Sequence, residues 1–382
     1  MYIVFADDSV SYDGYTPARR ALGGVEKAVV SLASALSDRT HEVTVLNNAG
    51  YPHMSMGVYY QSPDSTGVPR TADVVIAVRK PALLGAVRNV KHRLLFVPGP
   101  PDYLTSPANA PLWDSFQPAF LFVDPSQQRA YGGKIRNTLL RPGVRPAFQK
   151  EEAPVEPATA PYASLPLQQY VESNDIKPDE TAAATPPVPE PPAIPPPHAV
   201  VTTHPSHGLS DVIDMWTRQI HPQLPAARLS IYSAVLTKGL QGEAIPAELG
   251  PVLEKVKAAA GANVVVIEPR EDNGMAESYR QSRVHLYPGH PQDYACWTLQ
   301  ESQAAGLPAV ARAVGGVSTC IDNGQTGYIV PDAAAFANVT LEILRNDAVY
   351  KNLSDAAAAL ERRRTWDTVA GELEDYIASL GR

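Results

Sequence analysis

The sequence predicts an α/β protein with two doubly wound, Rossmann-like domains and a proline-rich segment between them. Short apolar runs alternate with amphipathic, helix-forming stretches in residues 1–150 and again in residues 198–362. The 382 residues are enough for two domains, and an apolar content of 44% is ordinary for a globular protein.

Residues 1–150 are expected to form the first sheet. Gly23-Gly24 opens a helix over residues 25–36, because the apolar residues there recur at helical spacing. Strands are expected at five apolar runs: Tyr2–Ala6, Glu42–Leu46, Val74–Val78, Leu94–Val97 and Phe120–Val123. The polar loop after the first strand, which holds Asp7 and Asp8, is either a solvated loop or a contact for a substrate, since such loops face the cleft of open α/β sheets.

Residues 151–197 differ in composition from the rest of the chain. Thirteen of these 47 residues are proline, and eight acids against one lysine give −7 of the formal net charge of −8. Such a composition cannot bury enough surface to offset its ordering entropy, so we expect an extended or disordered insertion. A passive tether and a docking segment for a protein partner both remain open.

Residues 198–362 are expected to form a second parallel sheet, with right-handed crossovers between its strands. Its strands are predicted at His198–Thr202, Arg228–Tyr232, Asn263–Ile267 and Val284–Tyr287. Its helices are predicted at Gly208–Ile220, Glu248–Ala260, Ala333–Leu344 and Asp347–Arg362. Residues 363–382 read as a last helix.

The stretch from Val284 to Val330 concentrates the chemistry. A buried strand ends at Pro288-Gly289, a polar loop with Asp293 follows, and a helix from Trp297 carries Glu301. A loop that feeds a helix points free backbone amides at anions, whereas carboxylates accept hydrogen bonds from hydroxyls. Together these groups suit a nucleotide sugar. The alternative is a plain strand–loop–helix unit with solvated acids.

The same stretch resembles the donor-binding signature of GT-B glycosyltransferases of the family-4 type, also called glycosyl transferases group 1. Seven residues lie between Asp293 and Glu301, as between the two acids of that signature. The further matches are Gly306, Pro308, Val310, Gly315-Gly316 and Asn323-Gly324-Gln325-Thr326-Gly327. Gly23-Gly24 before Glu26, and His41-Glu42-Val43, are similar to the opening of these enzymes.

The resemblance implies a role for each matching position. Glu301 would hold the nucleotide ribose, and Asp293 would hold hydroxyls of the donor sugar. The amides of Cys296, Trp297 and Thr298 would face the diphosphate. Gly24 could approach a phosphate closely, although it could equally be a simple turn glycine. The helix over residues 363–382 would pack back toward the first domain.

The chain departs from the family pattern where two cations usually neutralise the diphosphate. His207 stands where that family has lysine, and no arginine precedes it. Lys238 and Arg270 each follow a predicted strand, so they are alternative cations or ordinary surface charges. The family's first-domain histidine has no counterpart in Pro98–Asp102, and Cys296 replaces a glycine.

The predicted function is therefore transfer of a sugar from a nucleotide-sugar donor to a glycan, glycolipid or other acceptor, as in polysaccharide biosynthesis. By resemblance the reaction retains anomeric configuration and needs no metal or cofactor. The alternative is a catalytically weakened nucleotide-sugar-binding protein that acts in complex assembly. A nucleotide-sugar epimerase on the same architecture is a third hypothesis.

The composition also bears on partners and location. The near-neutral globular part has no basic stripe, which disfavours nucleic-acid binding. The N-terminus is too short and acidic for a signal peptide, and no apolar run is long enough to span a membrane. Two cysteines, Cys296 and Cys320, give no disulfide framework. We expect a cytoplasmic protein, and contact with the inner face of the membrane stays open.

Overall fold

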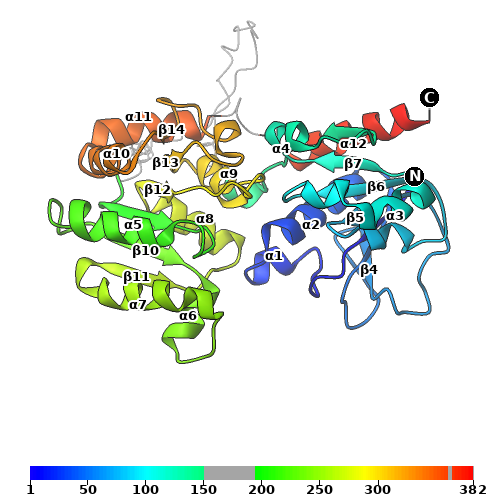
Figure 1. The fold of residues 1–382 in the computed structure, drawn as a ribbon, viewed down its shortest axis with the longest axis horizontal. Coiled ribbons are helices and arrows are strands. Elements are labelled where there is room, and N and C mark those ends of the chain that lie inside the picture. The colour runs from blue at the N-terminus through cyan, green and yellow to red at the C-terminus, as the bar shows by residue number, and fades with distance from the viewer. Residues whose placement is uncertain (150–193, 360–363, 382) are drawn as a thin grey trace, which may run out of the picture. The chain divides into compact units, whose positions relative to one another are not determined.

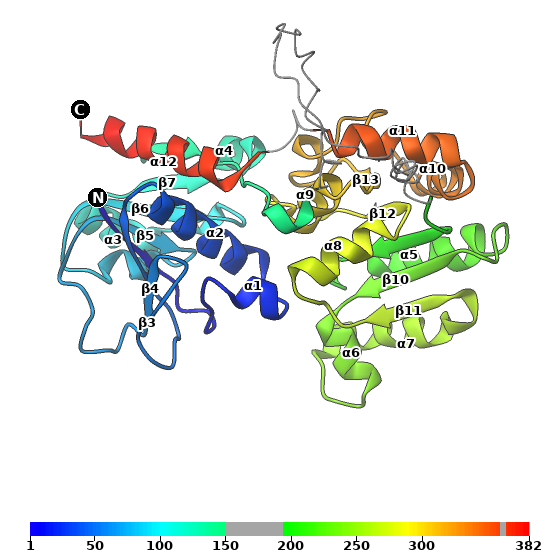
Figure 2. The same cartoon turned by 180° about the vertical axis from the view of Figure 1, so that it is seen from behind.

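The computed structural model describes residues 1–149, 194–359 and 364–381 (Figures 1 and 2). It confirms the predicted α/β architecture, because the chain forms two separate sheets of eight and six strands. Both sheets belong to one compact unit. Almost all of the predicted insertion at 151–197 lies outside the described residues.

The first sheet has its strands in the order β3-β4-β2-β1-β5-β6-β7-β8. All neighbours are parallel except β3 and β4, which form an antiparallel hairpin at one edge. The bounds are β1 (Tyr2–Ala6), β2 (Glu42–Leu46), β3 (His53–Ser55), β4 (Val58–Gln61), β5 (Thr71–Val78), β6 (Asn89–Val97), β7 (Ala119–Phe122) and β8 (Asn137–Leu139).

Three of these strands were not predicted from the sequence. β3 and β8 have three residues each and β4 has four, which is too short for a periodic pattern to be recognised. β5 and β6 also begin earlier than predicted, because their first residues are polar or charged and lie at the exposed start of the strand. The run of apolar residues alone therefore underestimates the length of both strands.

The helices of the first domain are α1 (Thr16–Arg19), α2 (Gly24–Asp38), α3 (Ala110–Phe116) and α4 (Pro125–Ala130). α12 (Trp366–Leu380), from the end of the chain, lies beside α2 (Figure 2). Its apolar residues Val369, Leu373 and Ile377 join the buried core of the first domain. Full burial of each such side chain stabilises the fold by roughly 1.5–3 kcal/mol.

The second sheet is entirely parallel, with the order β11-β10-β9-β12-β13-β14. Its strands are β9 (His198–Val201), β10 (Arg228–Tyr232), β11 (Val264–Ile267), β12 (Val284–Tyr287), β13 (Ala309–Arg312) and β14 (Gly327–Val330). Its helices are α5 (Leu209–Met215), α6 (Ala234–Leu240), α7 (Gly250–Ala258), α8 (Asp272–Arg280), α9 (Trp297–Ala304), α10 (Ala333–Arg345) and α11 (Asp347–Ala357).

Most predicted helix ends are off by one to three residues, and two of them differ by five. The helix predicted over 208–220 is α-helical only to Met215 and continues as a π-turn, in which the His221 amide donates to the Trp216 carbonyl. This wider turn accompanies full burial of Trp216, whose indole N–H donates to the Ala262 carbonyl at 2.8 Å. α11 ends at Ala357, five residues before the predicted end.

Candidate functional site

The candidate site lies at the carboxyl edge of the second sheet, where β12 ends and α9 begins. The turn after β13 packs directly on the loop between them, since the Gly316 amide donates to the Asp293 carbonyl at 2.9 Å. A Cβ on Gly316 would stand 1.9 Å from the Tyr294 carbonyl oxygen. The Gly315-Gly316 pair is therefore required by close approach of two backbone segments.

Asp293 uses its carboxylate within its own loop. One oxygen accepts from the Cys296 amide at 3.1 Å, and the other accepts from the Tyr287 hydroxyl. Cys296 then turns the chain into α9 with a left-handed φ of +46°, a conformation that glycine adopts more easily. The thiol is fully buried. Two of the carboxylate's acceptor positions are thus occupied, and further ones remain for a ligand.

Glu301 lies on the inner side of α9, in a buried network of charged groups. Lys27 of α2 places its Nζ 2.9 Å from Glu301 and 2.8 Å from Asp272 of α8. Asp272 also pairs with Arg145, whose guanidinium donates to the Ser31 hydroxyl at 2.7 Å. Glu301 and Asp272 are only 8% and 2% exposed, so two acids and two cations neutralise one another away from water.

Burial and pairing act in opposite directions on the two ends of this network. Burial raises the pKa of Glu301, and the positive charge of Lys27 only partly offsets that rise. Burial would lower the pKa of Lys27, but the two carboxylates outweigh it and raise that pKa above its ordinary value. Lys27 therefore stays charged at neutral pH and holds its two acids together.

Trp297 and Gly24 meet across the same space. A Cβ on Gly24 would stand 2.3 Å from the Trp297 ring, so the indole lies directly on the first turn of α2. Gly24, Lys27, Arg145, Trp297 and Glu301 line one cavity of only about 20 Å³. Among the described residues, the Trp297 and Thr298 amides have no hydrogen-bond acceptor, as expected for the first turn of a helix.

His207 lies in a group of three imidazoles rather than alone. Its ring stacks on His290 with centroids 4.0 Å apart, and His204 lies 5.4 Å away. Partial burial lowers the pKa of His207, and the two neighbouring imidazoles lower it further, against the attraction of Asp293. At neutral pH this imidazole is largely uncharged, so it does not by itself replace the expected lysine.

Lys238 and Arg270, the two alternative cations, do not join the charged residues of the candidate site. Lys238 is exposed in the last turn of α6, and Arg270 pairs with its neighbour Glu271 at 3.7 Å. Neither has a contact with Asp293 or Glu301 in the described part of the chain. The cations beside Glu301 are Lys27 and Arg145, which the sequence reasoning missed. Lys27 directly follows the Gly-Gly-x-Glu element, so its position was the available signal.

Two other features, a membrane-spanning helix and a metal-binding cluster, are absent from the described residues. No helix among them is long and apolar enough to cross a membrane. They also contain no group of three or more His, Cys, Asp or Glu residues placed to hold a metal ion.

Comparison with known proteins defines the class of protein. Residues 200–346 match the profile of the family described as Glycosyl transferases group 1. Sucrose-phosphate synthase from Thermosynechococcus elongatus superposes with a TM-score of 0.66 over 99% of this chain and 98% of that one, at 15% identity. HepE from Anabaena, in complex with UDP and glucose, gives 0.65 over 99% and 100%, at 13% identity.

Residues 200–346 of the second domain are thus similar to glycosyl transferases group 1, and the chain as a whole has the GT-B fold. This confirms the resemblance drawn from the sequence. The D-inositol 3-phosphate glycosyltransferase of Streptomyces coelicolor is 32% identical over 133 residues, which are 34% of this chain. The chain spans 29% of the length of that relative.

Proposed function

We propose that the protein is a glycosyltransferase that moves a sugar from a nucleotide-sugar donor to a glycan, glycolipid or other acceptor. One observation carries the proposal. Glu301, Asp293 and the free amides of α9 gather at the carboxyl edge of the second sheet, facing Gly24 at the start of α2. Ligands of open α/β sheets bind at this edge.

Each group has a chemical task in this proposal. Glu301 accepts hydrogen bonds from the ribose, and the unused lone pairs of Asp293 accept from the donor sugar. The amides of Trp297 and Thr298, at the positive end of α9, receive the diphosphate. Such preorganised dipoles stabilise the departing diphosphate as its charge develops, which is what a metal-independent, retaining transfer requires.

Donor binding requires the network around Glu301 to rearrange. Lys27 has to release Glu301, and it can do so without losing its charge partner because Asp272 lies 2.8 Å from the same Nζ. Trp297 has to leave the face of Gly24 for a phosphate to approach that glycine. The two movements open the small cavity that the five residues now enclose.

A catalytically weakened binding protein is the second candidate, and a specific observation favours it. Glu301 is already ion-paired, and the cavity beside it is about 20 Å³, far below the size of a nucleotide. His207, uncharged at neutral pH, leaves the diphosphate without the expected cation. In this candidate the donor binds but its sugar is not transferred, and the protein serves complex assembly.

A thermal-shift screen against UDP-, GDP- and ADP-sugars separates the two candidates. A donor at about 100 times its Kd stabilises the fold by roughly 2.7 kcal/mol, which raises the midpoint measurably. We expect one nucleotide to raise the midpoint of the wild type and of Glu248→Ala, an exposed acid on the same domain. Glu301→Ala, in which Lys27 keeps Asp272, should lose the shift.

The pattern of results identifies the function. A shift that depends on Glu301, followed by transfer of the sugar to an acceptor in extract, supports the glycosyltransferase. A shift without transfer supports the binding protein. If neither the wild type nor Trp297→Ala, which uncovers Gly24, responds to any of the nucleotides, the donor site proposed here is wrong.

A further inference from the structure

A second cavity lies at the amino edge of the first sheet, where its parallel strands begin. It has a volume of about 520 Å³ and is formed where β6, β7 and β8 begin, with Leu380 at the end of α12 as a further wall. These strands are parallel, so their amino ends share one edge and their carboxyl ends share the other. With nine residues at about 3.3 Å each, β6 alone separates the two edges by roughly 25–30 Å.

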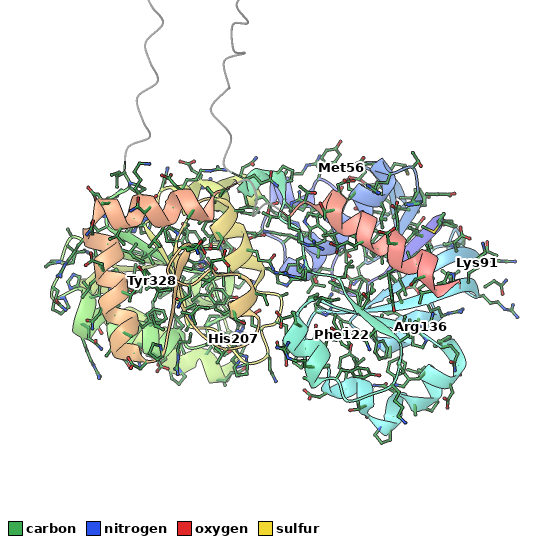
Figure 3. The ribbon with its side chains drawn as sticks, turned by 90° about the horizontal axis from the view of Figure 1, so that it is seen from above. Met56, Lys91, Phe122, Arg136, His207 and Tyr328 are labelled. Atoms are coloured by element: carbon green, nitrogen blue, oxygen red, sulfur yellow. The ribbon has the colours of Figure 1, made fainter. Side chains whose placement is uncertain are left out.

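The lining of this cavity is cationic and contains no acid. Its basic residues are Lys91, His92, Arg93, Lys134 and Arg136. Figure 3 labels Lys91 and Arg136, which lie at the same end of the first domain. Because the chain outside residues 151–197 is close to neutral, five basic side chains around one cavity are a local departure from the average.

Two of the five are held by the protein itself. Lys91 pairs with Asp73 at 2.8 Å. The Arg93 guanidinium donates to four backbone carbonyls, those of Leu84, Val87, Arg88 and Val90. Burial lowers the pKa of Arg93, and carbonyl oxygens do not cancel its charge. Arg93 therefore contributes a fixed positive charge to the wall of the cavity.

The other three basic side chains are free to meet a ligand. Lys134 and Arg136 are exposed, and His92 is half-buried. Within the described ranges, none of the three forms an ion pair with a carboxylate. The nearest acid on the adjoining helix α3 is Asp114, which is exposed and does not line the cavity. Two exposed cations, Lys134 and Arg136, thus share the cavity with the fixed charge of Arg93.

The floor of the cavity is aromatic and rigid. Trp113 donates its indole N–H to the Leu104 carbonyl at 3.0 Å and packs edge-on against Phe120 with centroids 5.2 Å apart. Phe116 lies 5.3 Å below the guanidinium of Arg93. These contacts fix both rings before any ligand arrives, so a flat or apolar group can be received at little entropic cost.

From this cavity we infer a second ligand site, at the amino edge of the first sheet, for a phosphate-bearing compound. Its phosphate group lies between Lys134 and Arg136, with Arg93 behind it, and its apolar or ring portion lies on Trp113 and Phe116. Arginine and lysine are the common protein partners of phosphate. The site does not depend on the donor site, because the two cavities share no lining residue.

A titration with inorganic pyrophosphate tests the site directly, followed by tryptophan fluorescence because Trp113 lines it. The test variant is Lys134→Gln/Arg136→Gln. The matched control is Arg228→Gln/Lys257→Gln, which removes two exposed positive charges from the second domain. We expect at least a tenfold loss of affinity in the test variant, less than a twofold loss in the control, and loss of the signal in Trp113→Phe.

Vesicles distinguish the two sources of a phosphate group. Binding to vesicles of 30% phosphatidylglycerol in phosphatidylcholine, lost in Lys134→Gln/Arg136→Gln, identifies a lipid headgroup. Pyrophosphate binding without vesicle binding identifies a free phosphorylated compound. The inference is overturned if the wild type binds neither, or if the test and control variants weaken binding equally.

Discussion

The charged side chains at the two edges of the first sheet differ in whether they form ion pairs. At the carboxyl edge, Lys27 holds Glu301 and Asp272, while Arg79 holds Asp7 and Glu26 at 2.8 and 2.9 Å. At the amino edge, Lys134 and Arg136 have no carboxylate partner in the part of the chain that the structure describes. Both edges are rich in charged residues, and only the pairing differs.

This difference separates charges that stabilise the protein from charges that are available to a ligand. A buried acid whose cation is removed keeps the full cost of its desolvation, so the paired groups at the carboxyl edge are needed for folding. A solvated cation without a partner costs little, so the groups at the amino edge can be kept for binding. The donor proposed here must compete with Lys27, whereas an anion at the amino edge has no competitor.

The largest expected effect comes from removing the central cation of the carboxyl edge. Lys27→Met should lower the free energy of unfolding by about 3–5 kcal/mol, because Glu301 and Asp272 would stay buried with only Arg145 opposite them. Urea denaturation at pH 7 measures the loss. Lys27→Arg, which keeps the charge, serves as the control. A loss below about 1 kcal/mol in Lys27→Met would show that this edge is not held by its ion pairs.

The second sheet sharpens the comparison, because it buries titratable groups that have no opposing charge. Burial lowers the pKa of His285 to about 3, and burial together with Arg228 lowers that of His198 to about 4. Between pH 6.5 and pH 4 these histidines bind protons in the unfolded chain but stay largely neutral in the folded chain. The free energy of unfolding should therefore decrease by up to about 1.4 kcal/mol for each histidine per unit decrease in pH.

This dependence is measured by urea denaturation at pH 7, 6 and 5. Other groups titrate in both proteins, but His285→Gln removes one buried histidine, so its stability should depend less steeply on pH than that of the wild type. Equal slopes in the two proteins would mean that His285 becomes protonated in the folded state.

A smaller effect is expected for Glu374 of α12, which pairs at the surface with two residues of the first domain. Glu374 accepts from Arg39 at 2.8 Å and pairs with His41 at 2.6 Å. These hydrogen bonds lower its pKa, so the contribution is present above pH 4.5 and is lost as the pH falls through the lowered value. Because the pair is partly solvated, Glu374→Gln should cost less than about 1 kcal/mol at pH 7. Thermal unfolding at low and high salt checks it, since screening should reduce the difference.

The smallest effect is expected at the amino edge itself. Lys134→Gln/Arg136→Gln should change the free energy of unfolding by no more than about 0.5 kcal/mol, because exposed cations without partners add little to stability. The measurement is the same urea titration that is used for Lys27→Met. A loss near 3 kcal/mol would mean that these cations are structural, and the comparison between the two edges would fail.

The sequence predicted the elements that have long, regular patterns. α2 and the strands β1, β2, β10 and β12 were recognised from periodic apolar residues, and the spacing of Asp293 and Glu301 predicted the group 1 resemblance. The hairpin of β3 and β4 and the short β8 were missed. Three or four residues carry too little periodicity, and tertiary pairing with a neighbouring strand decides their conformation.

The roles of single residues divide in the same way. The sequence by itself determined which residues stand at the ends of strands, because apolar runs and glycine turns are local properties of the chain. Only the tertiary structure decided which charges meet. Lys27 and Glu301 are 274 positions apart, and no local pattern links them. The five basic residues of the amino edge come from two separate segments, 91–93 and 134–136, so only parallel alignment of β6, β7 and β8 brings them around one cavity.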